Sequence, residues 1–157
     1  MQIFCDLDGV KADFAKHYEF LFGHDCDSVD DDIMWANIHT IPTYWLDLPL
    51  MEDWNILWEY IKPHHPVFLT GCPSSGFELA DVGKRQYVRK YSGDYHVITC
   101  LSKNKPIHMY SKGDILIDDL SKNIRRWEQA GGIGILHKNA VDTIAQLDAI
   151  LKQRGAA

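Results

Sequence analysis

The sequence lacks the features that mark several classes of protein. It has no C-x-x-C pair, because its four cysteines lie far apart at Cys5, Cys26, Cys72 and Cys100. Cysteine usage therefore indicates neither a zinc site nor a disulfide framework, and we expect reduced, mostly buried thiols in a cytoplasmic protein. No apolar run is long enough to span a bilayer, so we expect no membrane partner.

Basic residues are also scarce. The chain has 16 Lys and Arg against 22 Asp and Glu, a formal net charge of −6. Proteins that bind nucleic acids neutralise phosphates with Lys and Arg, so a polynucleotide is a disfavoured partner. With 157 residues, of which 46% are hydrophobic and 24% charged, the sequence predicts one globular domain and excludes a disordered chain or a coiled coil.

Five short apolar stretches, bounded by Gly, Pro or Asp, are typical of strands buried on both faces of a parallel sheet. These stretches are Gln2–Cys5, Pro66–Leu69, Tyr95–Thr99, Asp114–Ile117 and Gly132–Leu136. Between and after them, apolar residues at helical spacing predict helices at Phe77–Tyr91, Ser121–Ala130 and Val141–Leu151. Strands that alternate with helices predict an α/β fold, a three-layer sandwich around a five-stranded parallel sheet.

Residues 14–62 interrupt this alternation. They contain no strand of the buried type, and we expect helices at Phe14–Phe22 and Trp54–Ile61 with irregular or helical structure between them. The acidic run from Asp25 to Asp32 is not a calcium loop, because Val29 and Asp30 stand where such a loop needs an oxygen ligand and a glycine. We expect a solvated acidic loop there. The whole segment is too long for an ordinary connection and is typical of an insertion that covers something.

Acidic residues follow two of the predicted strands. Asp6 and Asp8 come directly after the first strand, and Asp118 and Asp119 come directly after the fourth. Ligands bind at the carboxyl ends of the strands in open α/β sheets, and carboxylates that meet there repel one another unless a cation lies between them. Oxygen ligands without a nearby His or Cys favour Mg²⁺.

Two further features follow predicted strands. Thr70-Gly71 ends the second strand and offers a hydroxyl and backbone amides that suit a phosphate oxygen. Lys103 and Lys105 follow the third strand and could neutralise both a phosphate and a carboxylate cluster. Each feature alone has an ordinary explanation, such as a turn, a helix cap or a solvated charge. Their common position after predicted strands is what indicates a site.

These residues resemble the four motifs of the haloacid dehalogenase (HAD) superfamily of phosphohydrolases, in the order Asp6–Val10, Thr70, Lys105 and Asp118–Asp119. The sequence is more specifically similar to the 5′(3′)-deoxyribonucleotidase family. That similarity lies in DLDGVKADF from Asp6, WLDLPLME from Trp45, LTGCP from Leu69, KRQYVRKYSG from Lys84 and DILIDD from Asp114. The resemblance implies a HAD-like core made of residues 1–13 and 63–157, with a small helical cap at residues 14–62.

The resemblance also implies a mechanism. Asp6 would be the nucleophile that forms an aspartyl-phosphate, and Asp8 would be the general acid and then the base. Mg²⁺ would be bound by the Asp6 carboxylate, the Asp8 backbone carbonyl and Asp119, with Asp118 as the alternative ligand. Thr70, the Gly71 amide and Lys105 would hold the phosphoryl oxygens.

The sequence departs from the family in two places. Lys11 stands where the family usually has a small or apolar residue, and we expect it to point to solvent. The segment Ser102–Gly113 is longer than the family's connection, which leaves Lys103 and Lys105 both open as the motif lysine. Lys84 is a third candidate and ranks last, because the family has a core helix there.

The expected activity is that of a Mg²⁺-dependent phosphomonoesterase acting on a nucleotide. The alternatives are a phosphatase for another small metabolite or a polynucleotide end, and a catalytically silent relative that binds a ligand. The expected partners are a small phosphomonoester and, in a homodimer, a second copy of the chain. Aromatic residues of the predicted cap, Trp35, Tyr44 and Trp45 among them, either stack on a nucleobase or form the cap's own core.

Overall fold

The chain forms a five-stranded parallel sheet in the order β3-β2-β1-β4-β5. The strands are β1 (Ile3–Cys5), β2 (Val67–Gly71), β3 (Val97–Cys100), β4 (Ile115–Asp118) and β5 (Ile133–Leu136). Each overlaps a predicted strand, and the predicted α/β fold around a five-stranded parallel sheet is confirmed in this computed structural model, which describes residues 1–155. The arrangement is Rossmann-like. The strand order reverses beside β1, which is where open α/β sheets bind ligands.

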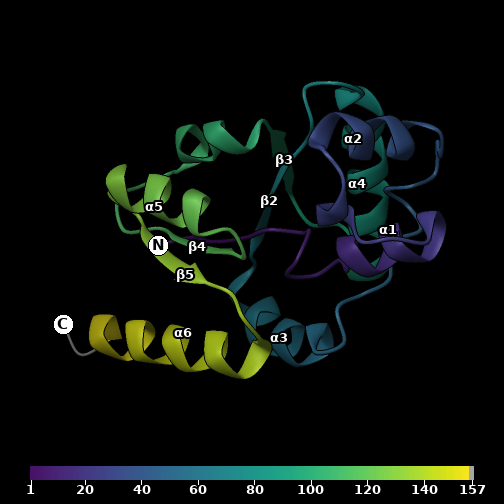
Figure 1. Cartoon of the computed structure of the whole chain (residues 1–157). Helices are drawn as coiled ribbons and strands as arrows, with labels where there is room; N and C mark the ends of the chain where they lie inside the picture. Colours follow the sequence, from purple (N-terminus) through teal and green to yellow (C-terminus); the bar gives the residue numbers. More distant parts are fainter. Residues whose placement is uncertain (156–157) are drawn as a thin grey trace.

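Helices cover both faces of the sheet (Figure 1). α3 (Trp54–Ile61), α4 (Phe77–Ser92) and α6 (Ala140–Gly155) lie on one face, and α5 (Ser121–Gln129) and the short helix η3 (Ser102–His108) lie on the other. Successive side chains of a strand point to opposite faces. Ile3 and Cys5 therefore pack under α3 and α6, whereas Phe4 meets Trp127 of α5 edge-on, with ring centroids 5.2 Å apart. Both faces of β1 are thus buried.

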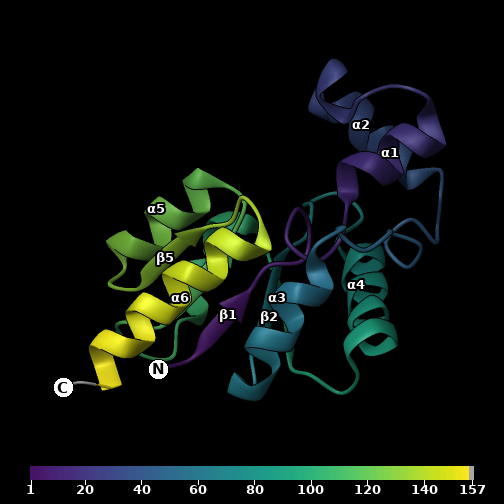
Figure 2. The same ribbon diagram turned by 90° about the horizontal axis from the view of Figure 1, so that it is seen from below.

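Two helices between β1 and β2 stand away from the sheet (Figure 2). They are α1 (Phe14–Phe22) and α2 (Asp31–His39), and we call residues 13–50 the α1–α2 segment. The segment has its own apolar core, which continues onto α4. A Cβ at Gly83 of α4 would lie 2.6 Å from Cβ of Trp45, so the absence of a side chain allows this close approach.

α3 also falls within the predicted cap range of 14–62, but it packs on the sheet. Trp54, Leu57 and Ile61 are buried in the same cluster as the strands, and α6 runs beside α3. The physical reason is that α3 presents an apolar face suited to the sheet. The division of the chain into a core and a cap stays a prediction, and the helices that stand clear of the sheet are α1 and α2.

Lys11 does not point to solvent, and this expectation was wrong. Its side chain is fully buried, and the Nζ atom lies 4.8–5.7 Å from the ring centroids of four aromatic side chains and contacts the hydroxyl of Ser92. These rings belong to Trp54, Trp58, Phe68 and Tyr87. Aromatic faces attract a cation, so these four rings act as partners for the buried ammonium group of Lys11. The sequence did not reveal these partners.

All four cysteines are buried, and none forms a disulfide. Within residues 1–155, no helix combines the length and the apolar character needed to cross a membrane.

Candidate active site

The loop after β1 brings Asp6 and Asp8 to the carboxyl end of the sheet. Cys5 pairs with Ile117 of β4, and the Asp6 N–H continues this ladder by donating to the Ile117 carbonyl at 2.9 Å. Asp6 is therefore fixed beside β4. The chain then turns at Gly9, whose φ of +77° is one that residues with a side chain rarely adopt.

Gly9 also makes room for an acid from β4. A Cβ at Gly9 would lie 2.0 Å from Oδ2 of Asp119, so a side chain there would displace that carboxylate. Carboxylate oxygens of Asp6, Asp118 and Asp119 lie within 4.8 Å of one another. The two distant acidic motifs of the sequence thus meet at one point.

The two acids after β4 differ in their hydrogen bonding. Asp118 is fully buried and accepts from Lys105 Nζ at 2.6 Å, from Asn123 Nδ2 at 3.0 Å and from the Leu120 N–H at 2.9 Å. Within residues 1–155, no hydrogen bond or ion pair reaches the Asp119 side chain, which lines a cavity. Asp118 is therefore occupied with protein partners, whereas Asp119 has oxygen atoms available for a ligand.

Lys105 is the positive centre of this cluster. It is buried, and its Nζ lies 3.0 Å from Asp6 Oδ1 in addition to its contact with Asp118. Burial alone would lower the pKa of Lys105, but the two carboxylates raise it above its usual range. Lys103, the other candidate on η3, is exposed, so the structure brings Lys105 and not Lys103 to the acids.

Lys84 also reaches the site, although it ranked last among the three lysine candidates. It lies on the core helix α4, is buried, and donates to Asp8 Oδ2 at 2.7 Å, to Thr70 Oγ1 at 3.0 Å and to the Gly71 carbonyl at 2.5 Å. Of the four acids at this site, Asp6, Asp8 and Asp118 therefore each have a lysine partner within the described residues, and Asp119 has none.

Burial and repulsion between carboxylates raise the pKa values of three acids at this site. Burial, followed by repulsion from Asp6, raises the pKa of Asp118 to about 6 despite its bond to Lys105. The same two causes raise the pKa of Asp119 to about 8. Burial also raises the pKa of Asp8, against the attraction of Lys84. Carboxyl groups so perturbed favour either a proton or a cation between them.

These residues fit a hard divalent cation. Three carboxylates converge, no His or Cys belongs to their cluster, and within the described residues the Asp119 side chain accepts no hydrogen bond. Asp6 and Asp119 have the oxygen atoms that could bind Mg²⁺, while Asp118 is held by its protein partners. The acidic cluster is thus a candidate metal site.

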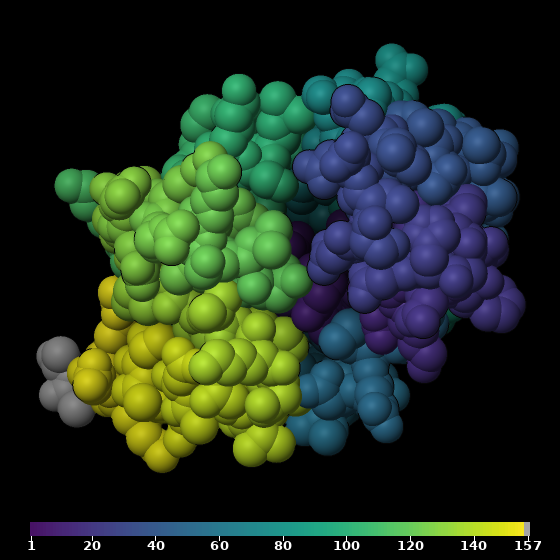
Figure 3. Space-filling model, in the orientation of Figure 1, coloured from purple at the N-terminus to yellow at the C-terminus, as the bar shows by residue number. Residues whose placement is uncertain are grey.

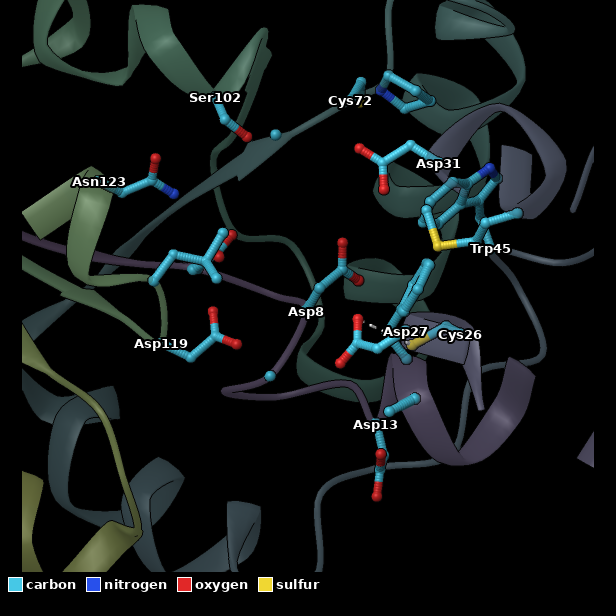
Figure 4. A pocket seen from close by; sticks show the side chains of 18 of the residues that line it. Asp8, Asp13, Cys26, Asp27, Asp31, Trp45, Cys72, Ser102, Asp119 and Asn123 are labelled. Carbon is cyan, nitrogen blue, oxygen red and sulfur yellow. Dashed lines mark hydrogen bonds between the residues drawn. The ribbon is translucent and has the colours of Figure 1, made fainter. Parts of the chain in front are cut away.

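A cavity of about 620 Å³ opens over the cluster, between the sheet and the α1–α2 segment. Figure 3 shows the hollow between the N-terminal segment in purple and blue and the green segment that carries α5. In Figure 4, Asp8 and Asp119 lie on opposite sides of its floor, and Asp27 and Asp31 reach in from the α1–α2 segment. Cavities of this size hold small molecules.

The predicted phosphate-binding residues lie in two positions. Gly71 lines the cavity, whereas Thr70 is fully buried behind it and its hydroxyl accepts from Lys84. The hydroxyl of Ser102 lies in the cavity wall, so close to Gly71 that a Cβ on the glycine would be 2.1 Å from it.

The sequence analysis missed Ser102 and Asn123 and ranked Lys84 last among the lysine candidates. Ser102 lies just beyond the third strand, as other site residues do, and this position was the one signal that pointed to it. Asn123 and Lys84 lie on helices, where a polar residue is most often exposed, and helical position gave no signal that either side chain reaches the acids.

Comparisons with known proteins bear on the fold. No protein-family model matches the sequence, and no curated protein matches it. The structure is similar to the crystal structure of a hydrolase from Streptococcus pneumoniae TIGR4, with a TM-score of 0.51 and 16% sequence identity over 94% of this chain and 97% of that chain. At this level of identity the similarity shows a shared fold.

Proposed function

We propose that this protein is a Mg²⁺-dependent phosphomonoester hydrolase of the HAD type, and that its substrate is a nucleoside monophosphate. One observation carries the proposal: at the strand-order reversal of the sheet, Asp6 lies 3.0 Å from Lys105 and shares an acidic cluster with Asp119, beside a cavity large enough for a small molecule. The arrangement agrees with the roles that the motif resemblance implies.

The first chemical step is assigned to Asp6. An Asp6 carboxylate oxygen attacks phosphorus, the bond from phosphorus to the leaving oxygen breaks, and an aspartyl-phosphate forms. Lys105, 3.0 Å from Asp6 Oδ1, orients the nucleophile and attracts the negative charge of the phosphoryl group. The hydroxyl of Ser102 and the backbone of Gly71 line the same wall and are placed to contact phosphoryl oxygens.

Asp8 is assigned the proton transfers. Its raised pKa favours a protonated carboxyl group, which donates its proton to the leaving alkoxide. The resulting carboxylate then takes a proton from water, the water oxygen attacks phosphorus, and the bond to Asp6 breaks to release phosphate. Lys84, bonded to Asp8 Oδ2, holds the other oxygen of this carboxyl group in place.

A divalent cation supplies positive charge to the phosphoryl group when bound, and Asp6, the Asp8 carbonyl and Asp119 would hold it. Asp118 positions Lys105 and the loop after β4 through its three hydrogen-bonding partners. A catalytically silent relative is disfavoured, because Asp6 and Asp8 are both present and loss of either would be the expected mark of such a relative.

Phosphate release tests the proposal. We expect the protein to hydrolyse p-nitrophenyl phosphate with Mg²⁺ but not with EDTA, and we expect Asp6→Asn to abolish the reaction. Asp32→Asn is the matched control, because Asp32 is exposed on α2 and does not line the cavity. Hydrolysis that survives in Asp6→Asn would contradict the assigned nucleophile.

A substrate panel tests the nucleotide. It compares 5′- and 3′-nucleoside monophosphates with sugar phosphates and with a 3′-phosphorylated oligonucleotide. We expect nucleoside monophosphates to have the highest kcat/KM. Higher values for a sugar phosphate or for the oligonucleotide would replace the nucleotide by that substrate class.

A further inference from the structure

Lys84 differs from the other basic residues of its helix. Its side chain is 1% exposed, whereas the remaining basic residues of α4 are exposed: Arg85, Arg89 and Lys90. A lysine is almost never fully buried unless it is paired, because the loss of hydration of the ammonium group is costly. The burial of Lys84 is therefore explained by the groups that it contacts.

The ammonium group of Lys84 is fully engaged at the floor of the cavity. It has three N–H donors, and three acceptors lie within reach. Nζ lies 2.7 Å from Oδ2 of Asp8, 3.0 Å from Oγ1 of Thr70 and 2.5 Å from the carbonyl oxygen of Gly71. The end of strand β2 thus fixes the direction in which Lys84 donates to Asp8.

The α1–α2 segment supplies one more contact to the same ammonium group. Nζ of Lys84 lies 4.6 Å from the centroid of the Trp45 ring. Trp45 is 4% exposed and belongs to the apolar core of the segment, and the missing side chain at Gly83 lets it approach α4. An aromatic face attracts a cation most strongly where water is excluded. Trp45 therefore helps to hold Lys84 in place.

Asp8 depends on Lys84 for its orientation. Within residues 1–155, no other hydrogen bond or ion pair reaches the Asp8 side chain, which lines the cavity. A carboxyl group that is held by one donor can rotate once that donor is removed. Proton transfer requires a donor at the right distance and in the right direction, so whatever orients Asp8 controls its efficiency.

We infer that Lys84 and Trp45 are positioning residues for Asp8, and that the α1–α2 segment acts on proton transfer to the leaving group through the contact of Trp45 with Lys84. This inference rests on the proposed function, in which Asp8 is the acid. It gives the segment a part in the chemical step in addition to forming a wall of the cavity.

The test compares two substrates whose leaving groups differ in their need for a proton. Phenyl phosphate and p-nitrophenyl phosphate share the ring and the phosphate, but p-nitrophenolate is a much weaker base than phenolate and leaves more readily without a proton. The kcat/KM value covers the steps up to the loss of the leaving group, so it reports proton donation and not the later attack of water.

The acid itself calibrates the comparison. Asp8→Asn should lower kcat/KM for phenyl phosphate by about 10²-fold or more and lower that for p-nitrophenyl phosphate about tenfold less. Lys84→Met should show the same selective loss, because it leaves Asp8 present but without its hydrogen-bond partner. A residue that only stabilises the fold would lower both values equally.

Variants of Trp45 test the contribution of the α1–α2 segment. Trp45→Leu removes the aromatic face and should lower the ratio of the two kcat/KM values, phenyl phosphate over p-nitrophenyl phosphate, by about threefold or more. Trp45→Phe retains an aromatic face and should restore most of the ratio. The ratio is measured within one preparation, so it does not depend on how much of a variant is folded, and Trp45→Leu keeps the inference testable where Lys84→Met does not fold.

Lys90→Met is the matched control. Lys90 lies on the same helix, is exposed and also contacts an aromatic ring, with Nζ 4.9 Å from the centroid of Tyr91. It does not line the cavity. The variant removes the same charge from α4 and should keep the wild-type ratio.

The outcomes separate this inference from the proposed function. Absence of hydrolysis of both substrates by the wild type, or equal losses in Asp8→Asn, would defeat the proposed function. A selective loss in Asp8→Asn combined with equal losses in Lys84→Met, or with a wild-type ratio in Trp45→Leu, would overturn the inference alone.

Discussion

Asp119→Asn should have opposite effects on the metal-free and the metal-bound protein. Asp119 lies within 4.8 Å of two other carboxylates, and within residues 1–155 no hydrogen bond or ion pair reaches its side chain. Asparagine has nearly the same shape and no charge. The variant should therefore relieve repulsion in the absence of a cation and lose a ligand in its presence.

The size of the effect follows from the pKa. Burial and repulsion raise the pKa of Asp119 from 3.8 to about 8 in the folded protein, so the folded chain binds a proton that the unfolded chain releases. Stability therefore falls as the pH rises from about 4 to about 8. At pH 7 the pKa difference amounts to an upper bound of about 4 kcal/mol, at about 1.36 kcal/mol per unit. Relaxation of the partly buried side chain reduces this, and we expect a gain of about 1–2 kcal/mol.

Thermal unfolding measures both effects. In EDTA at pH 7.5, a gain of about 1–2 kcal/mol raises the Tm of Asp119→Asn by about 2–8 °C, and the gain should shrink toward pH 5 as the wild-type carboxyl group becomes protonated. Added Mg²⁺ should raise the Tm of the wild type by mass action and raise that of the variant much less.

Asp118→Asn is the matched comparison. It removes the charge that Lys105 contacts at 2.6 Å, so it should lower the Tm in EDTA. A lower Tm for Asp119→Asn in EDTA at pH 7.5, or an undiminished response of that variant to Mg²⁺, would refute this account of the acidic cluster.

Two further replacements probe buried lysines. Lys105→Met leaves Asp6 and Asp118 without their buried partner, so it should lower the free energy of unfolding, measured in urea, by about 3–5 kcal/mol and lower kcat by about 10²–10³-fold. A free energy of unfolding equal to that of the wild type would contradict the ion-pair assignment. Burial lowers the pKa of Lys11 from 10.5 to about 7, so the unfolded chain binds more protons between these values and wild-type stability should rise over that pH range. Lys11→Met should remove this rise when urea unfolding is compared at pH 7.5 and 9.5, and an equal slope in both proteins would show that Lys11 keeps its proton.

The sheet could be predicted because its strands carry a local signal. A strand buried on both faces is a short apolar run, and β1 and β4 are such runs ended by an acid. α2 has no comparable signal, because Met34 and Ile38 are buried whereas Ile33, next to Met34, is exposed. Its boundaries could not be predicted from periodicity.

The burial of Lys11 and Lys84 could not be predicted from the sequence. A lysine is exposed by default, so Lys11 was expected in solvent, and Lys84 ranked last because the family has a core helix at its position. What buries them is a set of partners from distant segments: aromatic rings around Lys11, and Asp8 beside Lys84. Asp27 and Asp31 were expected to belong to a solvated loop, because the sequence does not show that this segment lines the cavity.

The pairing of β1 with β4 has a consequence for synthesis of the chain. Asp6 is made long before its partners, because the strand beside it and the ammonium 3.0 Å from its carboxylate come from positions after 100. A nascent or truncated polypeptide that ends before Lys105 holds Asp6 without either partner. The acidic cluster therefore assembles only after β4 has been synthesised and has joined β1, which makes the activity proposed for this site a sensitive report of folding.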